Sequence, residues 1–245
     1  MTTDTVPKTA VVEGTVVDGA GGWRVGGMAK GAGMLAPGLA TMLVVLTTDA
    51  VAEPAVLDAA LREATRTTFD RVDSDGCMST NDTVLLLASG ASGVRPSPGE
   101  LTGAVHQVCA DLARQLVADA EGASHDIAVE VRRAATEDEA VDVARAVCRS
   151  NLFKAAVFGN DPNWGRILAA VGTTSAAFDP LELDVSVNGV QVCRAGGVGE
   201  DRSLVDMTPR ECRVVIDLHA GDATATVWTN DLTHEYVHEN SAYSS

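Results

Sequence analysis

Thr41 is the residue whose type and position are most able to do chemistry. It follows a segment rich in glycine and proline, residues 30–40, and it precedes the apolar run 42–46 (MLVVL). Because such a run is long enough for a fully buried strand, Ala40 and Thr41 are expected where a flexible loop meets a rigid element. Self-cleaving chains use this arrangement: the hydroxyl attacks the preceding carbonyl, and the broken peptide bond leaves an α-amine beside that hydroxyl.

The new amine matters because an unassisted threonine hydroxyl is a weak nucleophile at neutral pH. A threonine paired with its own N-terminal amine is a recognised solution. An α-amine has a pKa of about 7.7–8.0, and a general base works best near the operating pH. An Ala-Thr pair alone also fits an ordinary junction between a loop and a strand, so the motif by itself leaves both interpretations open.

The composition restricts the class of protein. A chain of 245 residues with 46% hydrophobic residues can build one large domain or two small ones. Its net charge of −16 opposes binding to nucleic acid or to anionic membranes. The N-terminus lacks the pattern of a signal peptide, and no apolar run reaches the length of a membrane span. We therefore expect a cytoplasmic protein.

The cysteines argue against a metal centre and against a disulfide framework. Five of them are scattered along the chain without a CxxC motif, and the five histidines do not cluster with them. We expect most to be buried and reduced, with Cys77 exposed among polar neighbours. The remaining four are Cys109, Cys148, Cys193 and Cys212.

The hydrophobic pattern alternates between strand and helix periods. A long helix is predicted from a buried stripe, and Gly122 is expected to end it, which would put Glu121 at the helix terminus. The stripe is Leu101, Val105, Val108, Leu112 and Leu116. Strands are expected at 10–17, 23–28, 42–46, 84–88, 127–131, 183–187, 214–218 and 224–228. Further helices are expected from Pro54, after a Thr136–Glu139 capping box, and over 167–171. A loop is expected at 158–166. The prediction is an α+β fold of layered mixed sheets with helices packed on them.

Six separated segments add a resemblance that covers essentially the whole chain. They are MTTDTVPK, VGGMAKGAGMLAPGLATML, STNDTVLLL, DAEGA, FGNDPNWGR and ENSAYSS. Together they resemble the self-processing ornithine acetyltransferase family of arginine biosynthesis, also called glutamate N-acetyltransferase. The resemblance implies a fold of the N-terminal-nucleophile type and a cut between Ala40 and Thr41.

The resemblance also implies a reaction and its residues. Thr41 would carry the acetyl group, with its freed α-amine as base, in a ping-pong transfer from N2-acetyl-L-ornithine to L-glutamate; some members also accept acetyl-CoA. No metal or cofactor is implied. Glu121 would hold the cationic substrate amine, although a helix C-terminus disfavours negative charge. The implied substrate-binding set is Thr2, Lys30, Thr41, Glu121, Asn240 and Ser245.

Three segments follow from this comparison. Residues 1–40 would be a remnant of the α chain with the cleavage loop, 41–150 the catalytic β-chain domain, and 151–245 an α+β domain that closes the pocket. Processed family members pair as an α/β heterotetramer. Full members carry a long segment before the equivalent of Met1, with a Thr-Gly oxyanion pair, so we expect this chain to be the C-terminal part of such an enzyme.

Other interpretations remain open. A protein with a self-processed threonine and water as the acceptor would be an amidohydrolase or aminopeptidase. A chain without the front segment would be an inactive fragment or a partner chain.

Arg166, beside Trp164, fits either a carboxylate clamp or a structural loop. The role of Lys154 is undecided. His125 stands where relatives usually show a lysine.

Overall fold

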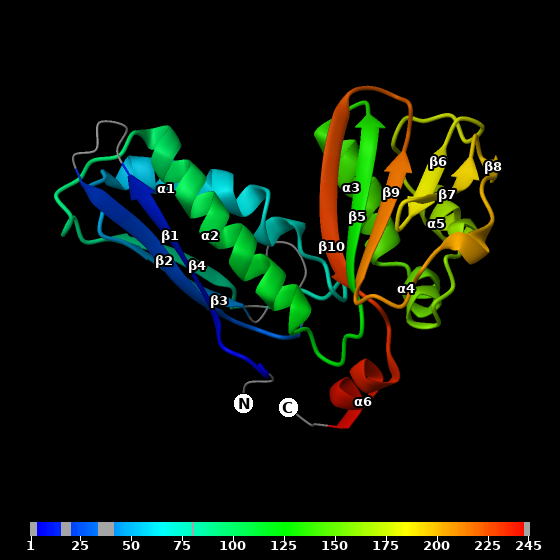
Figure 1. Cartoon of the computed structure of the whole chain (residues 1–245), viewed down its shortest axis with the longest axis horizontal. Coiled ribbons are helices and arrows are strands. Elements are labelled where there is room, and N and C mark those ends of the chain that lie inside the picture. The colour runs from blue at the N-terminus through cyan, green and yellow to red at the C-terminus, as the bar shows by residue number, and fades with distance from the viewer. Residues whose placement is uncertain (1–3, 16–20, 34–41, 80, 243–245) are drawn as a thin grey trace. The chain divides into compact units, whose positions relative to one another are not determined.

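The described residues form two compact units. The computed structural model describes residues 4–15, 21–33, 42–79 and 81–242. The first unit comprises Met1–Val72 and Gly76–Ala120, and the second comprises Asp73–Asp75 and Glu121–Ser245 (Figure 1). Among the described residues, no helix has the length and apolar character needed to cross a membrane. The three segments expected from the sequence are defined by cleavage and by the pocket, and they stay a prediction.

The first sheet has the order β1-β2-β3-β4 and is mixed. Its strands β1, β2 and β3 are antiparallel, whereas β4 runs parallel to β3. A parallel pair needs a long crossover, which here contains the helix α1 and the short 3₁₀ helix η1. The bounds are β1 Lys8–Thr15, β2 Gly22–Lys30, β3 Leu43–Thr48, β4 Thr83–Ala88, α1 Pro54–Arg66 and η1 Phe69–Arg71.

Burial on this sheet is one-sided, which corrects the expectation of fully buried strands at 42–46 and 84–88. Along β3, Val44, Leu46 and Thr48 are buried and the alternate residues are exposed. In β4 no residue is buried. The helices explain this, because α2 (Pro98–Ala118) packs on β1 and β2 and α1 packs on α2 and β4 (Figure 1). The opposite side, here called the open face, exposes Val11, Met28, Leu43, Val45, Leu85 and Leu87.

The long helix α2 has the stripe that the sequence predicts, and all five of its residues are buried. It begins with a capping box: Ser97 Oγ accepts a hydrogen bond from the Glu100 amide at 3.3 Å, and Glu100 Oε2 accepts one from the Ser97 amide at 2.8 Å. Gly27 lets the helix approach the sheet, because a Cβ there would lie 2.5 Å from Leu46 and 3.2 Å from Val108. The helix ends at Ala118, four residues before Gly122.

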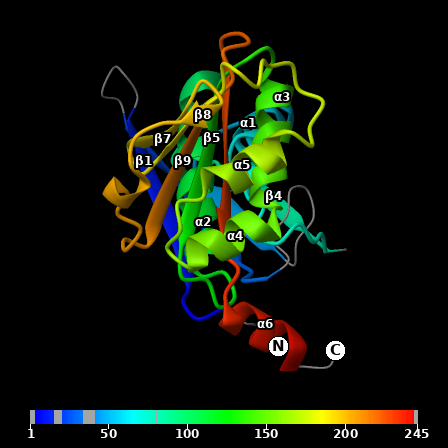
Figure 2. The same cartoon turned by 90° about the vertical axis from the view of Figure 1, so that its right-hand side faces the viewer.

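The second unit is built on a sheet of order β10-β5-β9-β6-β7-β8. Among the strands described there, β5 and β9 form the only parallel pair. The helix α3 packs on β5 and β10, and α4 and α5 lie against α3 (Figure 2). The strand bounds are β5 Asp126–Ala134, β6 Asp184–Val187, β7 Val190–Arg194, β8 Gly197–Val198, β9 Glu211–Asp217 and β10 Ala223–Asn230; the helices are α3 Glu137–Cys148, α4 Asn151–Phe158 and α5 Trp164–Val171.

These elements confirm the α+β class with mixed sheets, and they correct one segment. The expected loop 158–166 consists of the end of α4, residues 159–163 and the first turn of α5. The helix α6 (His234–Ala242), the strands β7 and β8 and the 3₁₀ helix η2 (Arg202–Leu204) were also not expected from the sequence. The cysteines lie as expected: Cys77 is exposed and the other four are buried. Burial raises the pKa of Cys109 and of Cys212 to about 12.

Candidate functional site

Three of the seven residues singled out by the sequence lie among the described residues. They are Lys30 in the first unit and Glu121 and Asn240 in the second. Thr2, Ala40, Thr41 and Ser245 lie outside the described residues, so their roles stay predictions.

Lys30 ends β2 on the open face, opposite Leu43 in the register with β3. The side chain is half-buried. A carboxylate lies near it at the start of β4: Asp82 Oδ1 accepts a hydrogen bond from the Met42 amide at 2.9 Å. Burial raises the pKa of Asp82, and the Met42 amide, the Ser79 hydroxyl and the charge of Lys30 only partly oppose that rise. Asp82 therefore fixes the residue directly after Thr41, a role that we did not predict from the STND segment.

A buried ion cluster fixes the chain next to Lys30. The Lys8 side chain is fully buried, and its Nζ lies 2.6 Å from Asp4 Oδ1 and 2.5 Å from Asp119 Oδ2. Asp4 Oδ1 also accepts a hydrogen bond from the Gly31 amide at 2.8 Å, and Asp119 accepts two from Thr5. Burial raises the pKa of both carboxyls, but these donors and Lys8 lower it further, so both remain below their ordinary range.

Glu121 and Asn240, which are 119 positions apart, are in contact in the structure. The Asn240 side-chain amide donates to Glu121 Oε2 at 3.0 Å and to the Tyr236 carbonyl at 3.0 Å. One expectation is wrong: Glu121 lies in a turn, because α2 already ends at Ala118. The helix dipole therefore does not explain the position of the Glu121 carboxylate. The observed hydrogen-bond partner of this carboxylate is the side-chain amide of Asn240 in α6.

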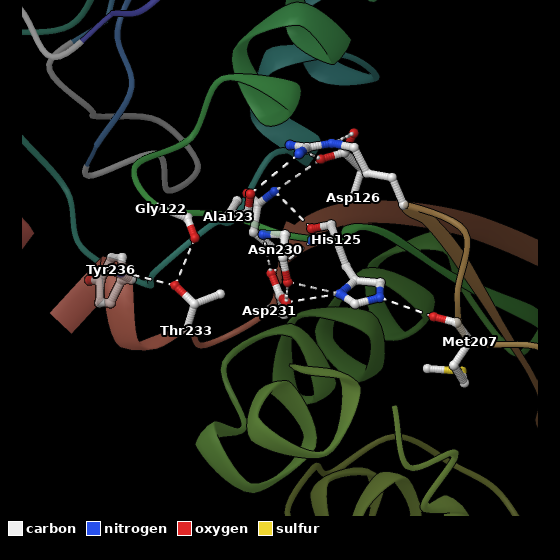
Figure 3. A network of polar contacts seen from close by, with 11 residues as sticks. Gly122, Ala123, His125, Asp126, Met207, Asn230, Asp231, Thr233 and Tyr236 are labelled. Atoms are coloured by element: carbon white, nitrogen blue, oxygen red, sulfur yellow. Dashed lines mark hydrogen bonds and ion pairs between the residues drawn. The ribbon is translucent and has the colours of Figure 1, made fainter. Parts of the chain in front are cut away.

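Polar contacts dock α6 on the turn that contains Glu121. Thr233 Oγ1 donates to the Gly122 carbonyl at 2.7 Å and accepts from the Tyr236 amide at 2.9 Å (Figure 3). The Tyr236 hydroxyl donates to Asp75 Oδ2 at 3.3 Å. Gly122 has φ +64°, and a Cβ there would lie 2.4 Å from the Tyr236 nitrogen. Since α6 has no buried residue, these polar contacts and the small size of Gly122 hold it in place.

A buried histidine–aspartate pair lies beside this contact. His125 Nδ1 lies 2.9 Å from Asp231 Oδ2, and its Nε2 lies 3.2 Å from the Met207 carbonyl oxygen (Figure 3). Ser124 Oγ contacts both Nδ1 of that ring and Asp231. A serine nucleophile needs the Nε2 atom as its base, and here Nε2 faces a backbone carbonyl. Ser124, His125 and Asp231 are therefore not arranged as a catalytic triad.

The two cations whose roles the sequence left undecided hold neighbouring segments together. Lys154 Nζ is buried and donates to the Ser74 carbonyl, and burial lowers its pKa. Arg166 Nη1 donates to the Leu152 carbonyl at 2.6 Å, which joins α5 to α4. Trp164 packs against the core of the second unit. This geometry favours the structural interpretation of Arg166.

Comparison with known proteins agrees with this architecture. The ArgJ family profile matches residues 1–245. The arginine biosynthesis bifunctional protein ArgJ of Streptomyces coelicolor is 68% identical over 244 residues, and that of Thermobifida fusca is 60% identical over 244 residues. Each match covers 100% of this chain and 62% of the relative, so the chain spans about 62% of the length of these relatives.

A solved structure extends the likeness to the fold. The crystal structure of the arginine biosynthesis bifunctional protein ArgJ from Bacillus halodurans matches with a TM-score of 0.76 at 33% identity, over 81% of this chain and 98% of that one. It supports the expected fold of the N-terminal-nucleophile type. Sequence and fold agree along the chain, and this chain belongs to the ArgJ family.

Proposed function

We propose that this chain takes part in the transfer of acetyl from N2-acetyl-L-ornithine to L-glutamate in arginine biosynthesis. The observation that carries the proposal is the family match over all 245 residues, together with relatives named as bifunctional arginine biosynthesis proteins. Both reactants are amino acids with an α-carboxylate and a short side chain, so a single ping-pong site suits them. Acetyl-CoA is a further donor to test.

In the proposed mechanism, the Thr41 hydroxyl attacks the Ala40 carbonyl, the peptide bond breaks, and water hydrolyses the resulting ester, which leaves a carboxylate on Ala40 and frees the hydroxyl and α-amine of Thr41. That amine takes the hydroxyl proton while the oxygen attacks the acetyl carbonyl of N-acetylornithine. Ornithine leaves with the proton, and the acetyl group remains as an ester on Thr41. The amine of glutamate then attacks the ester, which regenerates the hydroxyl and gives N-acetylglutamate. No metal or cofactor enters any step.

The substrate contacts are proposed for the residues matched by resemblance. The Lys30 ammonium would pair with a substrate carboxylate, and the Glu121 carboxylate would hold the cationic amine of the substrate beside the Asn240 amide. Thr2, Thr41 and Ser245 complete the set. The observed hydrogen bond from Asn240 to Glu121 supports the joint use of these two residues.

The size of the matched structural relative supports cleavage at this place. The match covers 81% of 245 residues, 0.81 × 245 or about 198 residues, and almost the whole of the related chain. Cleavage after Ala40 would leave 245 − 40 = 205 residues. The two lengths are close, as expected if the relative corresponds to the part that begins at Thr41.

The open face supports assembly with further polypeptide. Its six large apolar side chains are 37–65% exposed. Met28, Val45 and Leu85 are direct neighbours across three strands, so the apolar surface is continuous. Contiguous apolar patches on a protein surface usually mark an interface. We propose that the remaining 100 − 62 = 38% of the ArgJ sequence covers this face in an α/β heterotetramer.

A partner chain without activity of its own would also expose the apolar open face. Product analysis separates the possibilities. The chain is assayed with N-acetylornithine and glutamate, alone and coexpressed with the N-terminal part of an ArgJ relative, with Thr41→Ala as the inactive control. We expect N-acetylglutamate in the coexpressed sample. Free acetate without N-acetylglutamate would indicate an amidohydrolase, and no product in either sample would support the partner chain.

A further inference from the structure

The chain directly after β2 is held by one carboxylate oxygen. Asp4 Oδ1 accepts a hydrogen bond from the Gly31 amide at 2.8 Å and another from Lys8 Nζ at 2.6 Å. Gly31 is buried, and it directly follows Lys30, the residue proposed to pair with a substrate carboxylate. A buried amide needs an acceptor, and for Gly31 that acceptor comes from a residue 27 positions earlier in the chain.

The sheet itself holds Lys30 on one side only. In the register with β3, Lys30 lies opposite Leu43, whereas the ladder between β1 and β2 ends at the pair of Lys8 and Ala29. The residue before Lys8 is Pro7, which has no amide hydrogen to donate. Gly31 follows Lys30 with a φ of +144°, a backbone conformation that residues with side chains rarely adopt. On the β1 side, the bond from Gly31 to Asp4 therefore takes the place of a further ladder bond.

Asp4 is itself fixed by the rest of the ion cluster. The Lys8 ammonium is fully buried and contacts both Asp4 and Asp119, the residue that directly follows α2. Asp119 also accepts hydrogen bonds from the amide and the hydroxyl of Thr5, the neighbour of Asp4. The acceptor for the Gly31 amide is therefore tied to the end of a long, packed helix, which is a rigid support.

We propose that Asp4 is a positioning residue for the substrate contact of Lys30, and that it acts through the Gly31 amide. This inference rests on the proposed function, because it requires Lys30 to bind a substrate carboxylate. Asp4 does not touch the substrate; it fixes the backbone from which the Lys30 side chain extends. The stem of a lysine is flexible, so the place of its backbone decides which positions the ammonium can reach.

The other carboxylate close to Lys30 acts on a different segment. Burial raises the pKa of Asp82, and the charge of Lys30 opposes that rise, which places the two side chains near each other. Asp82 Oδ1 accepts its backbone hydrogen bond from Met42, directly before β3, at 2.9 Å. Asp82 thus holds the β3 side of Lys30, and Asp4 holds the chain after β2. Because the two carboxylates have separate backbone partners, a substitution of Asp4 tests one of them alone.

Two substitutions separate the oxygen of Asp4 from its charge. Asp4→Asn keeps an oxygen that Lys8 and Gly31 can both use, whereas Asp4→Ala removes it. In either variant Lys8 Nζ keeps its contact with Asp119 Oδ2 at 2.5 Å, so the buried ammonium retains a partner and the fold should survive.

The matched control is a carboxylate near the other end of β2. Asp49 Oδ1 accepts a hydrogen bond from the Arg24 amide at 2.8 Å. Asp49→Ala therefore removes the same kind of contact from the same strand, six residues away from Lys30.

Amide hydrogen exchange at Gly31, followed by NMR on the purified chain, tests the structural step without any substrate. We expect exchange at Gly31 to quicken by roughly tenfold in Asp4→Ala and by much less in Asp4→Asn. Asp49→Ala should leave Gly31 unchanged. The same rate at Gly31 in Asp4→Ala and in the unmodified chain would overturn the positioning role.

Glutamate binding, measured by calorimetry, shows whether Asp4 acts through Lys30. We expect roughly tenfold weaker binding in Asp4→Ala, with near-normal binding in Asp4→Asn and in Asp49→Ala. Lys30→Met removes the ammonium, and in that background Asp4→Ala should cause no further loss, because two residues that act through one contact are not additive. An equal loss with and without the Lys30 ammonium would overturn the proposal.

Failure of the proposed function gives a different result. The unmodified chain would then bind neither glutamate nor N-acetylornithine, or Lys30→Met would bind glutamate normally, and the positioning role would fall with that function. The exchange rate at Gly31 would still show whether Asp4 holds this segment.

Discussion

At the residue scale, buried charges help to select one folded arrangement of this chain. Two buried side chains, Lys8 and Asp73, each have a partner of opposite charge. Removing one member of such a pair typically costs about 3–5 kcal/mol, whereas replacing both by apolar groups is often neutral. Each pair joins segments that are far apart in sequence, so the charges select one arrangement of the chain. The cluster of Lys8 lies beside Lys30, which is proposed to contact substrate.

Acid is expected to weaken the second unit through Asp231. Its pKa in the folded chain is below the ordinary value of about 3.9 that applies to the unfolded chain. Its contribution to stability is therefore fully present above about pH 4 and is lost as the pH falls through the lowered folded pKa. The free energy of unfolding, measured in urea from pH 6 to pH 3, should fall less steeply in Asp231→Asn. Equal slopes for both proteins would contradict this account.

Gly122 is expected to tolerate no side chain. Its positive φ is strained for other residues, and a Cβ would lie 2.4 Å from the backbone nitrogen of Tyr236. Gly122→Ala should cost about 1–3 kcal/mol and should expose α6 to proteolysis. The matched control is Gly103→Ala, inside α2 with nothing within 4 Å of its added Cβ; it should stabilise by up to about 1 kcal/mol. Equal effects at both positions would show that α6 does not dock on this turn.

At the scale of elements, local patterns predicted what depends on local physics. The buried stripe of α2 and the two strands expected at 10–17 and 23–28 agree with the structure, because periodicity acts over short stretches. The apolar runs at β3 and β4 did not reveal how many layers cover the sheet, so full burial was wrong there. A run of apolar residues is equally compatible with a face that the chain itself covers and with a face that another polypeptide covers.

The candidate site was predictable only in part. The resemblance pointed to Glu121 and Asn240, and the structure brings them into contact. The ion cluster of Lys8 and the contact between His125 and Asp231 were not predicted, since contacts between side chains far apart in sequence leave no local pattern. The helix α6 was missed because it has no buried stripe and depends on polar contacts with a distant turn.

The start of α2 gives a prediction for an element. Ser97→Ala removes the side-chain acceptor of the capping box and should lower the free energy of unfolding by about 1 kcal/mol. The matched control is Glu53→Ala, at the corresponding position of α1, where the side chain makes no capping hydrogen bond. Chemical denaturation of both variants checks this, with little change expected for the control. Equal losses would mean that the capping box does not stabilise α2.

At the scale of the whole molecule, the open face should govern how the purified chain associates. Leu85→Glu places a charge on that face, in the edge strand β4, where the side chain is half-exposed, so the fold should survive and self-association should fall. Sedimentation or light scattering at several concentrations measures this. The matched control, Leu204→Glu, changes an exposed leucine in the second unit and should have no effect. Unaltered association in Leu85→Glu would argue against an interface there.

In the proposed mechanism Thr41 becomes an N-terminal nucleophile, and mass spectrometry of the chain coexpressed with the N-terminal part of an ArgJ relative tests this step. We predict that the 245-residue chain separates into pieces of 40 and 205 residues, since 245 − 40 = 205. After exposure to N-acetylornithine, one acetyl group should map to Thr41, and Thr41→Ala should abolish both changes. An uncut chain that still transfers acetyl, or an acetyl group on any other residue, would contradict the account.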